Sequence, residues 1–108
     1  MKPLAGIKVV ELGTLIAGPF AARILAEFGA EVIKVESPDG GDPLRKWRKL
    51  YEGTSLWWFV QARNKRSITL NLKHEKGREV LKKLLAEADI LIENFRPGVL
   101  EKLGLGWD

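Results

Sequence analysis

Cysteine is absent from the sequence, and histidine occurs once, at His74. Without thiols the chain can form neither a disulfide framework nor a thiolate site, and a single histidine is too few for the usual zinc ligand sets. No apolar run approaches the ~20 residues that span a bilayer. The first four residues, MKPL, lack the apolar core of a signal peptide. We therefore expect a cytoplasmic protein with no metal and no membrane partner.

The motifs of several enzyme classes are missing as well. There is no G-x-S-x-G segment of the serine hydrolases. The stretch from Gly13 to Gly18 is not G-x-G-x-x-G, because bulky Leu15 and Ile16 stand where a pyrophosphate needs close approach. Glu36 follows at roughly the distance of a ribose-binding acid, but that alone does not make a dinucleotide site. We do not expect a nicotinamide or flavin cofactor.

Nucleic acid is not an expected partner either. Trp47, Trp57 and Trp58 lie near basic residues and could stack on bases, yet no recognised nucleic-acid motif is present. The basic run at 63–66 could contact a phosphate, although such a run is more commonly a solvated surface. The formal net charge of +4 suits an anionic small molecule or a polyanion, and composition does not choose between them.

What the sequence does contain is a pattern of alternating strands and helices. Residues 6–12 and 30–36 are apolar and rich in β-branched side chains, which is typical of strands buried on both faces. Between them, Phe20, Ile24 and Phe28 recur at a four-residue step and line one face of a helix. Strand, crossover helix and strand within about 30 residues form a βαβ unit, which requires parallel strands.

The rest of the chain continues this alternation. A loop at 37–43 is followed by a short helix at 54–60, with Thr54 or Ser55 as its N-cap. Further on, the pattern predicts a strand at 66–72, a helix at 75–88, a strand at 89–93, a turn at 94–98 and a short helix at 99–103. With 108 residues, the chain is predicted to be one α/β domain: a Rossmann-like, mainly parallel sheet with flanking helices. No strand follows the last helix, so we expect the domain to be incomplete.

Ligands of such sheets bind outside the carboxyl ends of the strands, which directs attention to the turn at 13–19. Gly13 and Gly18 could admit a ligand close to the backbone, and the start of the following helix could bind an anion. Any strand-to-helix turn also uses glycine and proline for its geometry alone, so both explanations stay open.

Six stretches resemble the class III CoA-transferases, the family that includes formyl-CoA transferases, carnitine CoA-transferases and α-methylacyl-CoA racemase. They are PLAGIKVVEL (3–12), AGPFAARILAEFGAEVIKVE (17–36), GGDPLRKW (40–47), RNKRSITLNLK (63–73), KGREVLKKLLAEADILIENFRPG (76–98) and LEKLGLGWD (100–108). The resemblance is to the N-terminal part of the family's large domain. It implies that residues 1–108 belong to that one domain and include no second domain.

The resemblance also implies a coenzyme A site at the strand ends. Matched by position, the CoA-binding residues would be Ile16, Ala17, Leu70, Asn71, Leu72, Lys73, Asn94, Phe95, Arg96 and Lys102. The three cations would neutralise phosphates, and Phe95 would pack on adenine or the pantetheine arm. Ser37 stands where many members have arginine, so one phosphate contact is expected to be missing or moved. His74 replaces a threonine, and we expect it to cap the following helix poorly.

In the transferases of this family an aspartate attacks the acyl-CoA thioester, forms a mixed anhydride and then an aspartyl-CoA thioester, and hands CoA to an acceptor acid. That aspartate is expected beyond Asp108, so we assign no catalytic residue within the chain. The implied partners are an acyl-CoA, a carboxylic acid and a second copy in an interlocked homodimer. Two alternatives stay open: an acyl-CoA racemase of the same fold, with a downstream acid–base pair, and a non-catalytic CoA- or nucleotide-binding module.

Overall fold

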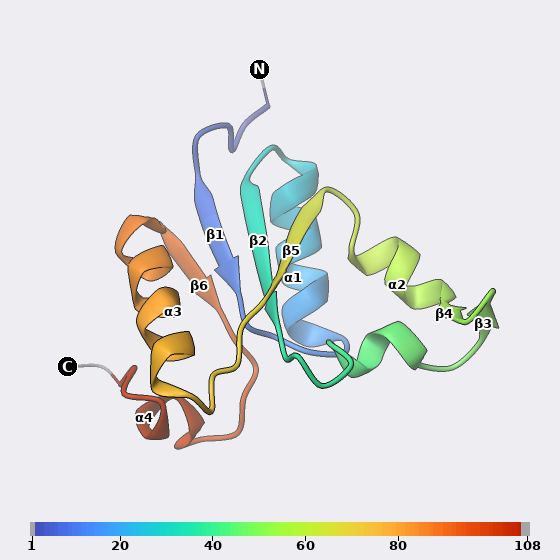
Figure 1. Ribbon diagram of the computed structural model, residues 1–108. Helices are drawn as coiled ribbons and strands as arrows, with labels where there is room; N and C mark the ends of the chain where they lie inside the picture. Colours follow the sequence, from blue (N-terminus) through green and yellow to red (C-terminus); the bar gives the residue numbers. More distant parts are fainter. Residues whose placement is uncertain (1, 107–108) are drawn as a thin grey trace.

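The computed structural model describes residues 2–106, which form an α/β fold with a parallel sheet between helices (Figure 1). The strands of the main sheet are β1 (Lys8–Glu11), β2 (Glu31–Glu36), β5 (Lys65–Thr69) and β6 (Ile90–Ile92). The helices are α1 (Ala17–Glu27), α2 (Leu56–Gln61), α3 (Glu75–Glu87), α4 (Val99–Lys102) and the 3₁₀ helix η1 (Pro43–Lys46). The predicted fold class is confirmed. The last two residues of the stretch at 100–108 lie outside the described part.

The main sheet has the order β5-β2-β1-β6, and every neighbouring pair is parallel. Along the chain this is third, second, first and fourth strand, which matches one half of the Rossmann order 3-2-1-4-5-6 and the first strand of the other half. The direction of winding reverses between β1 and β6, after the crossover through α3. All four strands point their carboxyl ends toward the lower edge in Figure 1, beside α4 and η1. A ligand site is expected at that edge.

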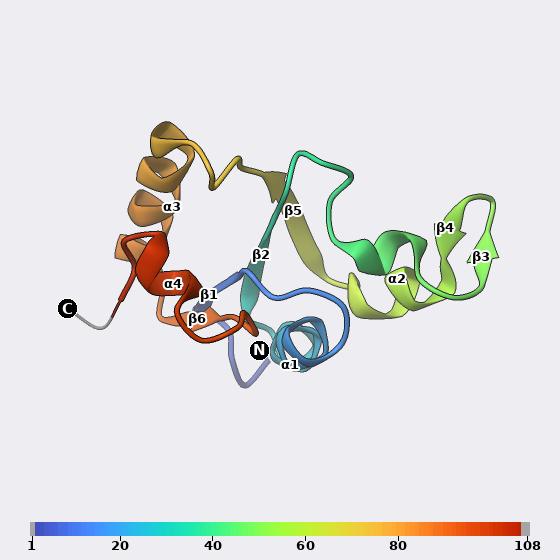
Figure 2. The same cartoon turned by 90° about the horizontal axis from the view of Figure 1, so that it is seen from below.

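The helices α1 and α3 cover opposite faces of the sheet (Figure 2). On the α1 face, Ala22 and Ala26 pack against Val9 and Val32. On the α3 face, Leu81 is fully buried with Val10, Leu12 and Val35. Val9 and Val10 are consecutive residues of β1 and enter different cores, because successive side chains of a strand point to opposite faces. The two-sided burial predicted for β1 is confirmed.

The face that α1 buries differs from the one marked by its large apolar residues. Its buried residues are small or cyclic: Gly18, Pro19, Ala22 and Ala26. Phe20 and Phe28 are instead 45% and 52% exposed. Small side chains let the helix approach the sheet closely, and the phenylalanines of the four-residue step are left outside. The four-residue step therefore does not mark the buried face of the helix.

His74 is a better helix cap than the sequence suggested. It is the N-cap of α3, and its Nδ1 accepts a hydrogen bond from the backbone N–H of Lys76 at 3.1 Å. A neutral imidazole nitrogen has the lone pair that this role requires, as the oxygen of a threonine would. The expectation of a poor cap is therefore wrong. For α2 the expected cap is confirmed, since the Ser55 side chain accepts from Trp57 N–H.

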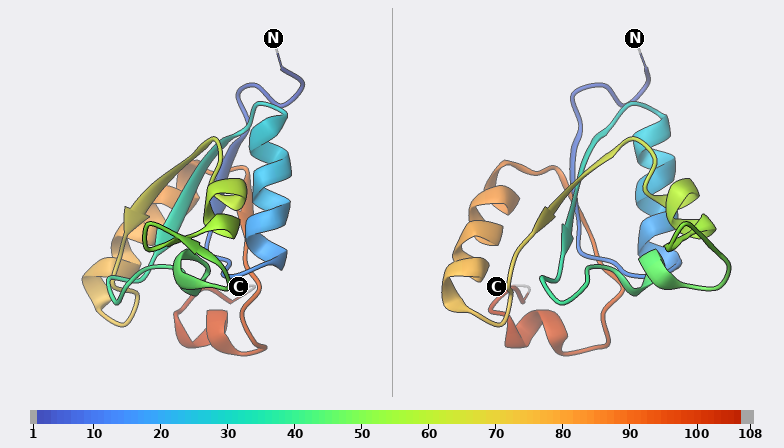
Figure 3. Two further views of the ribbon diagram at one scale, coloured as in Figure 1. Left: turned by 90° about the vertical axis from the view of Figure 1, so that its right-hand side faces the viewer. Right: turned by 45° about the vertical axis from the view of Figure 1, so that its right-hand side comes forward.

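The segment between β2 and β5 contains a small hairpin that the pattern did not predict. It pairs β3 (Leu50–Tyr51) with β4 (Thr54–Ser55) in antiparallel register. Each strand has only two residues, which is too short for a periodic signal. The hairpin and α2 extend to one side of the molecule (Figure 3), and α2 contacts α1. The sheet strand after them, β5, ends at Thr69, so residues 70–72 belong to a loop.

Candidate ligand-binding site

A cavity of about 400 Å³ opens where the four strands of the main sheet end. Residues 12–14 follow β1, residues 35–39 and 41–43 end and follow β2, and residues 70–73 follow β5. Phe95 follows β6, and Leu103 comes from the end of α4. The cavity therefore includes the point between β1 and β6 where the winding reverses, which is where open α/β sheets bind ligands.

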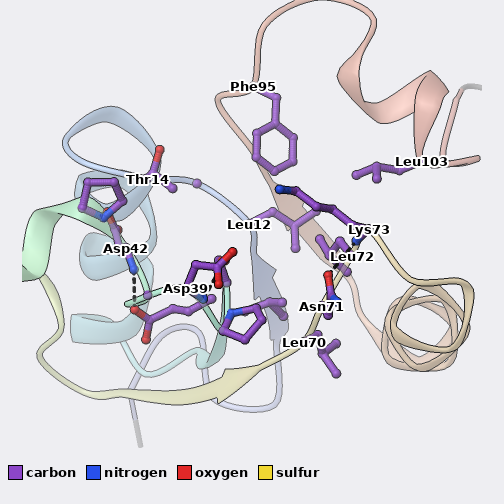
Figure 4. A pocket seen from close by; sticks show the side chains of 17 residues that line it. Leu12, Thr14, Asp39, Asp42, Leu70, Asn71, Leu72, Lys73, Phe95 and Leu103 are labelled. Carbon is purple, nitrogen blue, oxygen red and sulfur yellow. Dashed lines mark hydrogen bonds between the residues drawn. The ribbon is translucent and has the colours of Figure 1, made fainter.

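The cavity combines an apolar interior with a polar rim (Figure 4). Its apolar side chains are Leu12, Val35, Leu70, Leu72, Phe95 and Leu103. Lys73 stands at the rim with its amine pointing toward Phe95, and it is exposed. Within residues 2–106 Lys73 forms no ion pair. An unpaired ammonium beside an apolar wall suits a ligand that has an anionic group on an apolar body.

Asn94 joins the turn after β1 to the segment after β6. Its Oδ1 accepts from the N–H of Thr14, and its Nδ2 donates to the carbonyl of Thr14, both at 2.9 Å. Beneath this amide, a Cβ on Gly13 would lie 2.8 Å from the Cα of Gly18 and 3.1 Å from Asn94 Oδ1. The two glycines are required by this close backbone packing. The geometric explanation of the turn accounts for them without a ligand.

The loop after β5 is fixed by helix α3. The Oδ1 of Asn71 accepts from Lys73 N–H at 3.1 Å, and Arg78 donates to the Leu72 carbonyl at 3.0 Å. The carbonyl of Asn71 lies so close to Gly77 that a side chain at Gly77 would overlap it. The backbone that carries Asn71, Leu72 and Lys73 is thus held in place by protein contacts alone.

A network of four buried, charged side chains lies beneath the cavity. Lys34 Nζ contacts Glu11 Oε2 at 2.7 Å, Asp42 Oδ2 at 2.8 Å and the Gly13 carbonyl at 2.9 Å. Lys65 Nζ contacts the other Glu11 oxygen at 2.7 Å and the Pro19 carbonyl at 2.9 Å. Burial lowers the pKa of Lys65, and the Glu11 carboxylate opposes that shift. Two carboxylates and two ammonium groups balance one another inside the protein.

Glu36 forms a second ionic contact at the edge of the cavity. Its carboxylate accepts from Arg45 Nε at 2.8 Å and Arg45 Nη2 at 2.7 Å, from Asp42 N–H at 2.8 Å and from the Ser67 hydroxyl. Burial alone would raise the pKa of Glu36, but these hydrogen bonds outweigh it and lower the pKa to about 2. The hydrogen bond to Glu36 raises the pKa of Arg45, whose guanidinium also lies 3.8 Å from the ring centre of Trp58. Because all these groups are occupied, Glu36 is not available to bind a ribose.

Residues 4–108 match the sequence model of CoA-transferase family III. The chain belongs to this family. It is 54% identical to the succinyl-CoA–D-citramalate CoA-transferase of Chloroflexus aurantiacus over 99% of its own length and 27% of that protein's. It is 44% identical to the human succinyl-CoA:glutarate CoA-transferase, covering all of this chain and 25% of that protein. The chain thus spans about a quarter of the length of the relatives it matches.

Solved structures of similar sequence have the same fold. The crystal structure of a CaiB/BaiF family protein from Brucella suis superposes with a TM-score of 0.89 at 46% identity. The match covers 98% of this chain and 29% of that one. The topology described above is therefore also the fold of the corresponding part of that protein.

The residues expected to bind CoA in this family fall into four groups. Leu70, Asn71, Leu72, Lys73 and Phe95 line the cavity at the strand ends. Asn94 supports its wall through Thr14. Arg96 lines a neighbouring cavity of about 540 Å³ that shares Phe95, and Lys102 lines another of about 350 Å³ between α3 and α4. Ile16 and Ala17 are exposed at the start of α1 and line neither of the two cavities that contain Phe95. CoA contact at all ten positions stays a prediction.

Sequence reasoning missed the loop after β2 and the charges beneath it. The loop lines the cavity from Ser37 to Asp39 and again from Gly41 to Pro43. A signal for the buried charges was present, because Glu11 and Lys34 each stand between two large apolar residues. Lys65 was read as part of a solvated or phosphate-binding run at 63–66, but its side chain is 2% exposed and paired with Glu11.

Neither a metal site nor a membrane-spanning helix was expected from the sequence. Across residues 2–106 no group of three or more histidine, cysteine or acidic side chains is arranged to hold a metal ion. No helix in the same part of the chain has the length and apolar character to cross a bilayer.

Proposed function

We propose that residues 1–108 are the N-terminal part of the large domain of a CoA-transferase and that the cavity at the strand ends binds coenzyme A. The full protein would move CoA from an acyl-CoA donor to a carboxylic acid. The observation that carries this proposal is the position of Lys73 and Phe95: a cation that forms no ion pair within residues 2–106 and an aromatic ring share one cavity at the strand ends of a family III chain.

The chemistry of the cavity is compatible with parts of CoA. Its volume of about 400 Å³ lies within the range of small-molecule sites. CoA has an aromatic adenine, a long and largely apolar pantetheine arm, and several phosphates. The apolar wall suits the first two, and Lys73 at the rim suits a phosphate through a charge-assisted hydrogen bond. Arg96, in the adjoining cavity, would contact a second anionic group.

The covalent step is proposed to use an aspartate beyond Asp108. Its carboxylate would attack the thioester carbonyl, releasing CoA thiolate and forming an acyl-aspartyl anhydride. The thiolate would then attack the aspartyl carbonyl, giving an aspartyl-CoA thioester and freeing the donor acid. The acceptor carboxylate would then attack the aspartyl-CoA thioester, releasing CoA thiolate and forming a second anhydride. The thiolate would attack the acceptor's carbonyl in that anhydride, giving the CoA thioester of the acceptor and free aspartate. The residues described here would bind and orient CoA and take no part in bond making.

The test is the affinity for CoA of the protein as its host produces it, measured by isothermal titration calorimetry. Lys73→Ala and Arg96→Ala should each raise the Kd about tenfold or more, because a hydrogen bond to a charged group contributes about 1.5–3 kcal/mol. Lys83→Ala removes an exposed lysine from α3 away from both cavities and serves as the matched control. An unchanged Kd in both cavity variants would remove the assignment of the site.

A separate assay tests the reaction class. Incubating the same protein with an acyl-CoA and a labelled carboxylic acid should transfer CoA to the labelled acid. Exchange of the α-hydrogen of the acyl group without transfer would identify a racemase instead. CoA binding with neither activity would identify a non-catalytic binding module.

A further inference from the structure

The buried charges beneath the cavity have no role in the proposed function. The side chains of Glu11, Lys34, Asp42 and Lys65 are each at most 2% exposed. Replacing a buried ion pair by well-packed apolar residues is often neutral or stabilising, so a gain in stability does not by itself explain four such side chains. Their geometry indicates what they do.

Asp42 is the point where these charges reach the cavity wall. Its Oδ1 accepts from Leu15 N–H at 3.0 Å and from Leu44 N–H at 2.9 Å, while its Oδ2 faces Lys34. The Asp42 N–H in turn donates to Glu36 at the end of β2. One side chain therefore connects the turn after β1, the start of η1 and strand β2, and both loops that it holds line the cavity.

The hydrogen bond from Leu15 N–H to Asp42 is made at a residue with a strained backbone. Leu15 has φ = 62°, in the left-handed region that is unfavourable for a leucine. Such a conformation persists only where surrounding contacts determine it. The Asp42 carboxylate is one such contact, and Lys34, which also pairs with Glu11, holds that carboxylate in place. Without the Asp42 carboxylate, the turn that carries Gly13 and Thr14 into the cavity loses a restraint.

We propose that Asp42 is a positioning residue of the ligand site: anchored by Lys34 and Glu11, it holds the β1–α1 turn and the loop at 37–43 in the arrangement that admits the ligand. The proposal rests on the proposed function for the identity of that ligand, CoA. Asp42 acts through the two loops and is not expected to touch the reacting atoms.

Two measurements on the protein as its host produces it test this proposal: the Kd for CoA, and the hydrogen exchange of backbone amides without ligand. Asp42→Ala should raise the Kd at least tenfold and speed exchange at Leu15 and Leu44. Asp42→Asn keeps an oxygen that can accept from the N–H groups of Leu15 and Leu44, but it removes the negative charge that faces Lys34. Its Kd and exchange rates are therefore expected to lie between those of the original protein and those of Asp42→Ala. Adding Lys34→Met to Asp42→Asn removes the unbalanced charge, and the Kd should recover to within about threefold of the original.

The matched control is Glu27→Gln, which removes the ion pair with Arg23 on α1, outside the cavity. It should leave the Kd and the exchange at Leu15 and Leu44 unchanged. Should Asp42→Ala fail to fold, the positioning role is tested by comparing the Kd of Asp42→Asn with the Kd of the double variant. Equal Kd values in those two variants, or exchange no faster than in Glu27→Gln, would overturn the positioning role.

The same measurements separate this proposal from the proposed function. If the unsubstituted protein binds no CoA while exchange at Leu15 and Leu44 responds as expected, the loops are positioned by Asp42 and the ligand assignment fails. If CoA binds equally well to the unsubstituted protein and to Asp42→Ala, the ligand assignment stands and the positioning role fails.

Discussion

Glu36 links the acid stability of the protein to the wall of its cavity. Its pKa is lowered from 4.5 to about 2 in the folded protein, so the unfolded chain binds the proton more tightly. The resulting stabilisation is fully present above pH ~4.5 and is lost as the pH falls toward ~2. A pKa difference of that size corresponds to a contribution of roughly 3 kcal/mol to the free energy of unfolding. Acid should therefore lower the free energy of unfolding from pH ~4.5 downward, while the pair between Glu36 and Arg45 persists in the folded protein until the pH nears ~2.

The corresponding variant is Glu36→Gln, which keeps hydrogen-bond acceptance but cannot titrate. Between pH 5 and pH 2 its free energy of unfolding should fall by roughly 3 kcal/mol less than that of the original protein. Urea denaturation at a series of pH values measures this difference. The exposed carboxylate variant Glu79→Gln is the control and should follow the original curve. Parallel pH curves for Glu36→Gln and the original protein would contradict the prediction.

At the scale of residues, the sequence predicted part of the cavity but not its ionic support. Leu70, Leu72, Lys73 and Phe95 were found because they follow strand patterns or match the family by position. The pairing of Lys34 with Asp42 was not predictable, because it depends on where a loop of Gly and Pro residues folds back. A charged residue in a strand is ordinarily assigned to solvent, and only the three-dimensional structure shows its partner.

Among the elements, α3 determines the position of the loop that carries Lys73, and Gly77 is the point of contact. Alanine at Gly77 would favour the helix by about 1 kcal/mol. Its Cβ would, however, overlap the Asn71 carbonyl, and overpacking of this kind costs about 1–3 kcal/mol. Since a backbone carbonyl cannot turn away as a flexible side chain would, the overlap should outweigh the gain in helix propensity.

Gly77→Ala is thus expected to lower the melting temperature and to raise the Kd for CoA by displacing the loop at 71–73. Ala86→Gly is a control on the same helix, because it costs about 1 kcal/mol of stability at an exposed position without touching that loop. It should lower the melting temperature while leaving the Kd unchanged. A stabilised Gly77→Ala protein with normal affinity would show that the loop adapts.

The elements themselves were largely predictable, and the exceptions have physical reasons. Strands β1 and β2 and helix α3 were found within a few residues of their ends because their apolar patterns are long. The β3–β4 hairpin is too short to produce such a pattern. The buried face of α1 was not identified, because small residues, rather than the phenylalanines, face the sheet there.

Considered as a whole, the molecule leaves many large apolar side chains exposed. Helices α1 and α2 lie in contact and present Phe20, Leu56, Trp57, Phe59 and Val60 to solvent. Exposed apolar surface of this extent is typical of proteins that associate. In keeping with the homodimer expected from the family resemblance, we predict that a second copy covers this surface.

Sedimentation velocity across a range of concentrations tests this prediction. The protein as its host produces it should sediment as a dimer or larger, and Phe59→Asp should shift it toward the monomer, because a charge placed in an apolar interface is costly. Lys83→Asp, an exposed charge change on α3, should not alter the mass. A monomer at every concentration would contradict the prediction.

The pairing of β1 with β6 has a consequence for synthesis on the ribosome. Lys8 N–H donates to Asp89, and Thr14 pairs with Asn94, across separations of 81 and 80 residues. At translation rates of 5–20 residues per second, β1 therefore emerges ~4–16 s before its second neighbour. During that interval its valine-rich edge is unpaired and open to strands of other nascent chains. We expect the cavity to form only after β6 has been made, and the growing chain to depend on chaperones until then.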